Sequence, residues 1–220
     1  MLATILENEQ RRDLSRDYRI GALFSLIPAV GGQFLDLGSG NGEIANFLRG
    51  KYTHITLSDN SDILFNYLKD KFRSRADVSV EKIDINTFSF GMTSFDCITC
   101  SDVLEHLPND RPALKNIFRS LKSGGLLFLT VPAMPKLFGR RDRAGGHYQR
   151  YSKKSLKKMV EMEGFVIKHL TYWNMIGTIP YVVSEKILHK ELRGPARQVS
   201  GVWSNLLNRF LYLILWFLKF

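Results

Sequence analysis

Residues 34–43 have the sequence Phe34-Leu35-Asp36-Leu37-Gly38-Ser39-Gly40-Asn41-Gly42-Glu43. The first four residues are apolar except for Asp36, which is the pattern of a buried strand. Three alternate glycines follow, and they let the backbone turn tightly and allow a ligand to approach it closely. The next residues, 44–48, carry the apolar face of a helix. The pattern predicts a strand, a turn and a helix whose first amide groups point at a bound ligand.

The spacing of the glycines and the position of the acid indicate the charge of that ligand. A dinucleotide-binding turn has the spacing G-x-G-x-x-G. Here the third glycine comes one residue early, and Glu43 stands where the dinucleotide pattern has glycine. Asp36 lies inside the strand end, where it would repel a pyrophosphate and favour a cationic group.

The pattern D-x-G-x-G-x-G at residues 36–42 resembles motif I of the class I S-adenosylmethionine (SAM) methyltransferases. Their cofactor carries a sulfonium and an ammonium group. The resemblance implies an α/β fold with a doubly wound, mostly parallel sheet, and SAM contacts from Asp36, Gly38, Ser39 and Gly40. Taken alone, the motif leaves open a nucleotide-binding turn of another α/β enzyme.

Three later segments resemble the remaining cofactor contacts of this family. The second expected strand, 54–59, ends in Asp59, which the resemblance places on the ribose hydroxyls, with Asn60 beside the adenine. The third, 78–84, leads to Asp84 and Ile85, which the resemblance places on the adenine. The fourth, 95–100, precedes Ser101 at the methyl group, and N-terminal helices within 1–30 would bring Arg19 to the SAM carboxylate.

The segment Ser101-Asp102-Val103-Leu104-Glu105-His106-Leu107-Pro108 resembles type 11 and type 12 methyltransferases, which include enzymes of quinone pathways. Some of those bind a divalent metal through an acid-x-x-Glu-His cluster, and residues 102–106 have that spacing. Glu-His-Leu-Pro also occurs in relatives without a metal. We therefore expect no metal, and His106 is a candidate catalytic residue.

Residues 133–151 have no apolar period and are expected to form a loop after the fifth strand. Gly145-Gly146-His147-x-x-Arg150-Tyr151 resembles a Gly-His-x-Arg-Arg-Tyr segment of the type 11 and 12 group, with Gln149 in place of the first arginine. We expect the loop to bind substrate, and His147 is the candidate base because the usual pKa of histidine lies near neutrality. Tyr151 is a further catalytic candidate. The candidate anion-binding and aromatic substrate contacts are Arg140, Arg141, Arg150 and Tyr148. The alternative is a solvated basic loop folded onto its own acids.

Other elements complete the expected domain. We expect a helix over 111–122, a fifth strand over 126–132, a helix over 153–163 with Ser152 as N-cap, and a sixth strand over 165–173. Both cysteines lie in the apolar fourth strand and are expected to be buried thiols, which fits a reducing cytoplasm. The methyltransferase domain is expected over 1–175 and an apolar extension over 176–220.

The extension and the overall charge suggest contact with an anionic surface. Residues 203–220 are nearly all apolar but short for a membrane span, so they fit an interfacial helix, a buried helix, a dimer contact or a last strand. The net charge of the chain is +10. That charge favours nucleic acid, a phospholipid surface or a phosphorylated substrate as partner. Peripheral contact with the inner membrane face is therefore one expectation.

Together these features predict a SAM-dependent methyltransferase acting on an oxygen or nitrogen of a small or lipid-linked, anionic acceptor. Two alternatives stay open. A nucleic-acid methyltransferase would explain the charge, although Ser101-Asp102-Val103-Leu104 stands where an N-P-P-Y-type target-base motif would follow the fourth strand. A non-catalytic protein that keeps the fold and binds SAM is the other.

Overall fold

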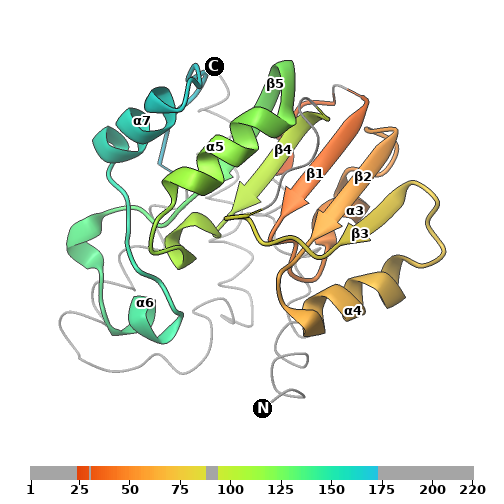
Figure 1. Ribbon diagram of the computed structural model, residues 1–220, viewed down its shortest axis with the longest axis horizontal. Helices are drawn as coiled ribbons and strands as arrows, with labels where there is room; N and C mark the ends of the chain where they lie inside the picture. The colour runs from red at the N-terminus through yellow and green to blue at the C-terminus, as the bar shows by residue number, and fades with distance from the viewer. Residues whose placement is uncertain (1–23, 30, 88–93, 173–220) are drawn as a thin grey trace, which may run out of the picture. The chain divides into compact units, whose positions relative to one another are not determined.

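The computed structural model describes residues 24–29, 31–87 and 94–172. Within it, five parallel strands form one sheet with the order β3-β2-β1-β4-β5 (Figure 1). The strands are β1 Gln33–Leu37, β2 His54–Ser58, β3 Val78–Glu81, β4 Phe95–Ser101 and β5 Leu121–Thr130. The expected doubly wound α/β fold is confirmed.

The strand order places the ligand crevice. From β1 the chain winds outward through β2 to β3, and it then returns to place β4 on the other side of β1. The order therefore reverses between β1 and β4. In open parallel sheets, ligands bind at such a switch point, beyond the carboxyl ends of the strands. The glycine turn after β1 stands at that position.

The described helices are short. They are α3 Glu43–Phe47, α4 Asp62–Phe72, α5 Arg111–Ser120, α6 Arg140–Ala144 and α7 Lys153–Met162, with 3-10 turns η2 Leu104–His106 and η3 Pro135–Leu137. Helices α3, α4 and α5 lie between strands, whereas α6 and α7 both follow β5. The expected N-cap of α7 is confirmed, because the Ser152 hydroxyl accepts the amide of Ser155.

One hydrophobic cluster joins α5 and α7 to the sheet. Leu35 and Leu37 of β1 and Ile98 of β4 pack there against Leu114 of α5 and Val160 of α7. Figure 1 shows α5 crossing the sheet over β4 and β5. Both cysteines are buried free thiols, as expected, and burial raises the pKa of the Cys97 thiol to about 11. The described residues from Ile27 to Thr171 belong to one compact unit.

Three expectations about local structure are wrong. The helix expected over 111–122 ends at Ser120, because Leu121 already pairs with Phe95 of β4. Residues 133–151 contain η3 and α6 and so are not a structureless loop. Residues 165–172 form no strand: Phe165 packs edge-on against Phe118 with ring centroids 5.0 Å apart, and Val166 is 80% exposed.

Other expectations lie outside the described residues. These are the helices over most of 1–30, with Arg19, and the apolar extension 176–220, with its 203–220 segment. Among the residues that the structure does describe, none of the helices has the length and apolar character that a membrane span needs.

The packing around Gly42 yields a first prediction. A Cβ atom there would lie 2.6 Å from Phe72 and 2.7 Å from Leu68, both on α4, and the residue has φ +73°. We expect Gly42→Ala to lower the free energy of unfolding by about 2–4 kcal/mol, from overpacking and left-handed strain together. Urea denaturation measures this.

Gly50→Ala is the matched control, because Gly50 has φ +76° but nothing lies within 4 Å of its Cβ position. Gly50→Ala should lower the free energy of unfolding by about 1 kcal/mol, because only the left-handed backbone strain acts there. Equal losses in the two variants would show that close packing of the glycine turn on α4 does not stabilise the fold.

Candidate functional site

The ends of β1 and β2 form a cradle around the glycine turn. The Gly40 amide donates to Oδ2 of Asp59 at 3.2 Å, and the Ser61 amide donates to Oδ1 of the same carboxylate at 2.9 Å. Ser39 joins the two strand ends, since its amide donates to the carbonyl of Ser58 at 2.8 Å and its hydroxyl accepts the Ser58 amide at 2.9 Å. Asp59 therefore holds the turn in place as well as offering a carboxylate to a ligand.

Asp36 is buried beneath this turn. It is only 6% exposed, and the Thr99 hydroxyl of β4 donates to its carboxyl group. Burial raises the pKa of Asp36 to about 6, and the nearby Asp59 carboxylate raises it further. Burial also raises the pKa of Asp59. Two desolvated acids at adjacent strand ends create a strongly negative site, which a cationic ligand would stabilise.

The other expected cofactor residues occupy neighbouring strand ends. Asp84 is exposed three residues beyond β3 and accepts the Asn86 amide at 2.9 Å, while Ile85 is buried. Asn60 is exposed next to Asp59. The Ser101 hydroxyl at the end of β4 is buried without a hydrogen-bond partner in the described part of the chain. The structure thus sets these residues along the carboxyl edge of β3, β2, β1 and β4.

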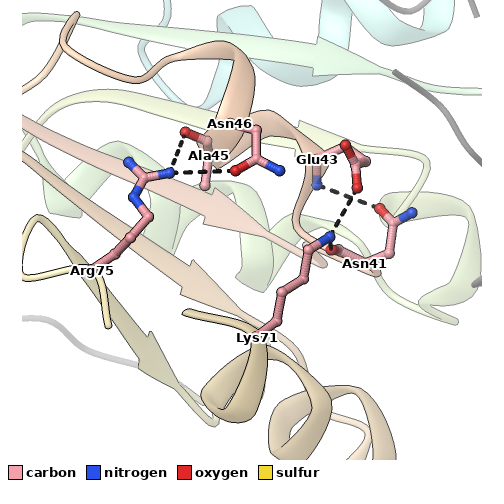
Figure 2. A network of polar contacts seen from close by, with 6 residues as sticks. All are labelled: Asn41, Glu43, Ala45, Asn46, Lys71 and Arg75. Carbon is pink, nitrogen blue, oxygen red and sulfur yellow. Dashed lines mark hydrogen bonds and ion pairs between the residues drawn. The ribbon is translucent and has the colours of Figure 1, made fainter. Parts of the chain in front are cut away.

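Two cations, Lys71 on α4 and Arg75 just after it, support the turn and α3, and sequence reasoning missed them (Figure 2). Lys71 Nζ donates to the carbonyl of Asn41 and to Oε1 of Glu43, both at 2.8 Å. Arg75 donates through a guanidinium NH to the carbonyl of Ala45 at 3.0 Å. Lys71 lies in the last turn of α4 and Arg75 three residues after its end, and nothing in the sequence shows which carbonyls they contact.

A second cluster forms beyond β4, from Glu105 and His106 of η2 and His147 after α6. The two imidazole rings meet edge-on with centroids 4.7 Å apart. Glu105 is 1% exposed, and its Oε2 atom has no hydrogen-bond partner within the residues described. Burial raises the pKa of Glu105 to about 8, with the Asp102 carboxylate as a smaller cause, and burial lowers the pKa of His106.

Hydrogen bonds hold the 133–151 segment against η2. The Tyr148 amide donates to the carbonyl of Glu105 at 2.7 Å, and Ala133 pairs with Tyr151 in an isolated bridge. In Figure 1 the segment with α6 lies beyond the arrowhead of β4. His147 lies 41 residues after His106 in the sequence, so spacing alone could not predict that the two rings meet.

Asp142 organises the inner side of this segment. Its carboxylate is 2% exposed, accepts Nε of Arg150 at 2.8 Å and the Gly139 amide at 2.8 Å, and lies 3.3 Å from Nδ1 of His147. The segment is therefore partly folded onto its own acid, as the alternative interpretation of the loop expected. Tyr148 projects outward, with 61% of its surface exposed.

The remaining expected site residues lie at different depths. Arg140 is exposed and Arg141 half-buried on α6. The Tyr151 hydroxyl is buried, donates to Asp110 at 2.8 Å and accepts the Gln149 side-chain amide at 2.9 Å. Burial and Asp110 raise the pKa of Tyr151 far above its ordinary value.

Within the described residues, the side chains that lie close enough to share a metal ion are Glu105, His106 and His147, whose ligand atoms are within 4.8 Å of one another. The motif spacing in the sequence suggested Asp102 in place of His147. Asp102 instead has φ 54° and turns toward β5, where Thr130 donates to it at 3.4 Å.

Comparison with known proteins agrees with this geometry. Residues 8–170 match the family described as "Methyltransferase domain". The chain is 30% identical over 181 residues to the ubiquinone/menaquinone biosynthesis C-methyltransferase UbiE of Vibrio cholerae, covering 68% of this chain and 69% of that protein. The chain belongs to the methyltransferase family.

Two further proteins are similar to this chain, one over a shorter stretch of sequence and one in structure at lower sequence identity. A ubiquinone biosynthesis O-methyltransferase of Coxiella burnetii is 30% identical over 106 residues, which is 48% of this chain and 45% of that protein. A solved SAM-dependent methyltransferase of Mesorhizobium loti shares the fold, with a TM-score of 0.60, 17% identity and coverage of 67% of this chain and 81% of that one. The expected class of enzyme and its cofactor, SAM, are thereby confirmed.

The buried acid of this methyltransferase predicts a pH effect on stability. The pKa of Asp36 is raised in the fold, so the carboxyl group favours the folded state when protonated, and that stability is lost as the pH rises through about 6. We expect Asp36 to lower the free energy of unfolding by about 3 kcal/mol as the pH rises from its ordinary pKa of 3.8 to about 6, at about 1.4 kcal/mol per pH unit. Urea titrations of the cofactor-free protein at a series of pH values measure it.

Asp36→Asn is the matched variant, because its Oδ1 still accepts the Thr99 hydroxyl but cannot ionise. Asp59 and Glu105, whose pKa values burial also raises, titrate alike in both proteins, so the difference in stability between wild type and variant should isolate the Asp36 contribution. If the free energies of unfolding of wild type and variant show parallel pH profiles, the fold does not raise the pKa of Asp36 and the prediction is wrong.

The cations behind the turn give a second prediction. We expect Lys71→Met to raise the Kd for SAM about three- to tenfold, because the Asn41 carbonyl and Glu43 lose a charged donor worth about 1 kcal/mol. Calorimetric titration with SAM measures it. Lys69→Met removes a charge from the same helix at a side chain that lies over Phe65, and it should leave the Kd unchanged.

Proposed function

We propose that this methyltransferase transfers the SAM methyl group to an oxygen or nitrogen of a small, lipid-linked acceptor that carries an anionic group. The observation that carries the proposal is the Glu105–His106–His147 cluster beside the end of β4, overlaid by a segment rich in arginine. An acceptor there would lie at the carboxyl edge of the sheet, next to the cofactor crevice. Relatives named for ubiquinone biosynthesis support a lipid-linked substrate class.

The proposed cofactor site uses the cradle between β1 and β3. Asp36 and Asp59 would stabilise the cationic and ribose parts of SAM, and Gly38, Ser39 and Gly40 would let it approach the turn. A Cβ atom at Gly38 would lie 2.4 Å from Val103, so the turn is already closely packed at this point. The remaining proposed contacts are Asn60, Asp84, Ile85 and Ser101, together with Arg19, which lies outside the described residues.

The proposed chemistry is in-line attack of the acceptor on the SAM methyl, with most of the rate enhancement from alignment in a site closed to water. For a hydroxyl acceptor, the proton leaves to His147. Asp142, 3.3 Å from Nδ1 of that ring, stabilises the protonated imidazole. His106 lies against His147 and its lowered pKa keeps it neutral, so it adds no opposing charge.

Tyr151 and Arg150 take supporting roles in this proposal. The Tyr151 hydroxyl is committed to Asp110, and Arg150 is paired with Asp142, so both hold the shape of the segment. The more accessible Arg140, Arg141 and Tyr148 are the proposed contacts to the anionic and aromatic parts of the acceptor.

A second candidate is methyl transfer to carbon. The Vibrio cholerae relative is named a C-methyltransferase, and it matches this chain over more of its length than the relative named an O-methyltransferase. In that case the same imidazole would remove a proton from a ring carbon or its neighbouring hydroxyl.

Incubation of the protein with SAM carrying a ¹³C methyl group and a bacterial lipid extract tests the acceptor class. We expect a new methyl signal in the organic phase with the carbon shift of a methoxy or N-methyl group, read by NMR. A shift typical of a methyl on an aromatic carbon would establish the second candidate. Transfer only to added RNA, or to no lipid component, would contradict the proposal.

Substitution of the base tests the mechanism on the acceptor that this assay identifies. We expect His147→Ala to lower kcat about 10²- to 10⁴-fold while the Kd for SAM stays within about twofold. His169→Ala, an exposed histidine beyond α7, should change neither. A full-activity His147→Ala protein would remove this residue from the proposed chemistry.

A further inference from the structure

The outer face of α7 carries a row of lysines that the proposed chemistry does not use. Leu156, Met159 and Val160 point inward and pack on the main hydrophobic cluster. On the opposite side Lys154, Lys157 and Lys158 are exposed, together with Glu161. We call the three lysines the basic face. A hollow of about 420 Å³ runs along it and ends at Met162.

An exposed apolar group adjoins the basic face where the helix ends. Met162 is 56% exposed, Val166 is 80% exposed and Phe118 of α5 is 43% exposed. Gly164 lies between the first two in sequence, and a Cβ atom there would lie 2.9 Å from the ring of Phe118. We call Phe118, Met162 and Val166 the apolar tip. Large apolar side chains left in water beside a row of cations mark an interaction surface.

The basic face also continues toward the proposed acceptor segment. Lys158 and Met162 line a cleft of about 510 Å³ whose other walls include Gln149 and Arg150. A molecule bound along α7 could therefore extend to the segment that carries His147. Among the described residues three acids lie near this charge: Glu161 is 3.7 Å from Lys157, Glu163 is paired with Arg111 at 3.2 Å, and Asp110 in the cleft accepts the Tyr151 hydroxyl.

We propose that the basic face and apolar tip of α7 dock on an anionic phospholipid surface. Lysines beside such a surface gain roughly fivefold in binding each, and apolar side chains at the end of an amphipathic helix enter the headgroup region. The apolar tip favours a membrane over nucleic acid, because single-stranded nucleic acid is bound by lysines interleaved with aromatic stacking platforms. α7 itself has no aromatic residue among its lysines, and the Phe118 ring of the apolar tip packs edge-on against Phe165.

This surface would present the acceptor segment to a lipid-linked substrate without removing that substrate from the bilayer. The proposal does not depend on which atom is methylated. It concerns residues other than those proposed to hold SAM, so cofactor binding and membrane binding can be tested separately in the same protein.

Flotation of the full chain with vesicles tests the proposal. We expect binding to vesicles of phosphatidylcholine mixed with phosphatidylglycerol, weakened by salt, and little binding to phosphatidylcholine alone. The triple variant Lys154→Gln, Lys157→Gln, Lys158→Gln should lower the partition coefficient roughly a hundredfold. The double variant Met162→Gln, Val166→Ser should weaken binding at all salt concentrations.

The matched control removes three charges from the other edge of the sheet, at Lys69, Arg73 and Lys82, each changed to Gln. These residues lie on or near α4 and β3, and we expect the control to retain most of the membrane binding. The Kd for SAM should match wild type in both triple variants, which shows that each is folded.

Three outcomes would overturn the proposal. Equal losses in the two triple variants would mean that net charge alone drives binding. Unchanged binding in the α7 variants would assign membrane contact to another part of the chain. Tighter, salt-sensitive binding of the basic face to RNA than to anionic vesicles would assign it to nucleic acid.

Discussion

At the end of β1, the carboxyl group of Asp36 is held out of water directly beneath a turn made of glycines. A buried acid is costly unless a hydrogen bond or a cation compensates it, and the Thr99 hydroxyl, which donates to the Asp36 carboxyl group, does so in part. A cationic ligand bound at this site would offset the desolvation free energy of the ionised carboxylate. The same desolvation that raises the pKa of Asp36 also raises the pKa of Asp59, the second acid of this site.

The glycine turn cannot hold this arrangement unaided, because α3 is only five residues long. Its support comes from α4, through the close approach of Leu68 and Phe72 to Gly42 and the Lys71 contact to a backbone carbonyl, and from Arg75 just beyond that helix. A helix this short offers few internal hydrogen bonds, so packing and side-chain donors from a neighbour take their place.

The other half of the crevice is built differently. There the chain after β5 folds back over η2, and the contact depends on single hydrogen bonds such as Tyr148 to Glu105 and on the buried Asp142 carboxylate. Glu105 keeps a buried Oε2 atom without a hydrogen-bond partner among the described residues, and His147 Nδ1 lies 3.3 Å from the Asp142 carboxylate at ion-pair distance without forming a hydrogen bond there. Unsatisfied buried polar groups are concentrated where a protein does chemistry, which is why this cluster, and not a surface arginine, carries the proposed acceptor site.

The sequence by itself determined the parallel sheet, the glycine turn and the acids at successive strand ends, because these depend on local periodicity and on backbone conformations that few residues adopt. Tertiary structure alone decided that His147 meets His106 and that Lys71 supports the turn, since each contact joins segments distant in the chain. It also decided where α5 ends and that residues 165–172 form no strand. A β-branched run becomes a strand only when a neighbouring strand supplies its hydrogen bonds, and a sequence does not record that neighbour.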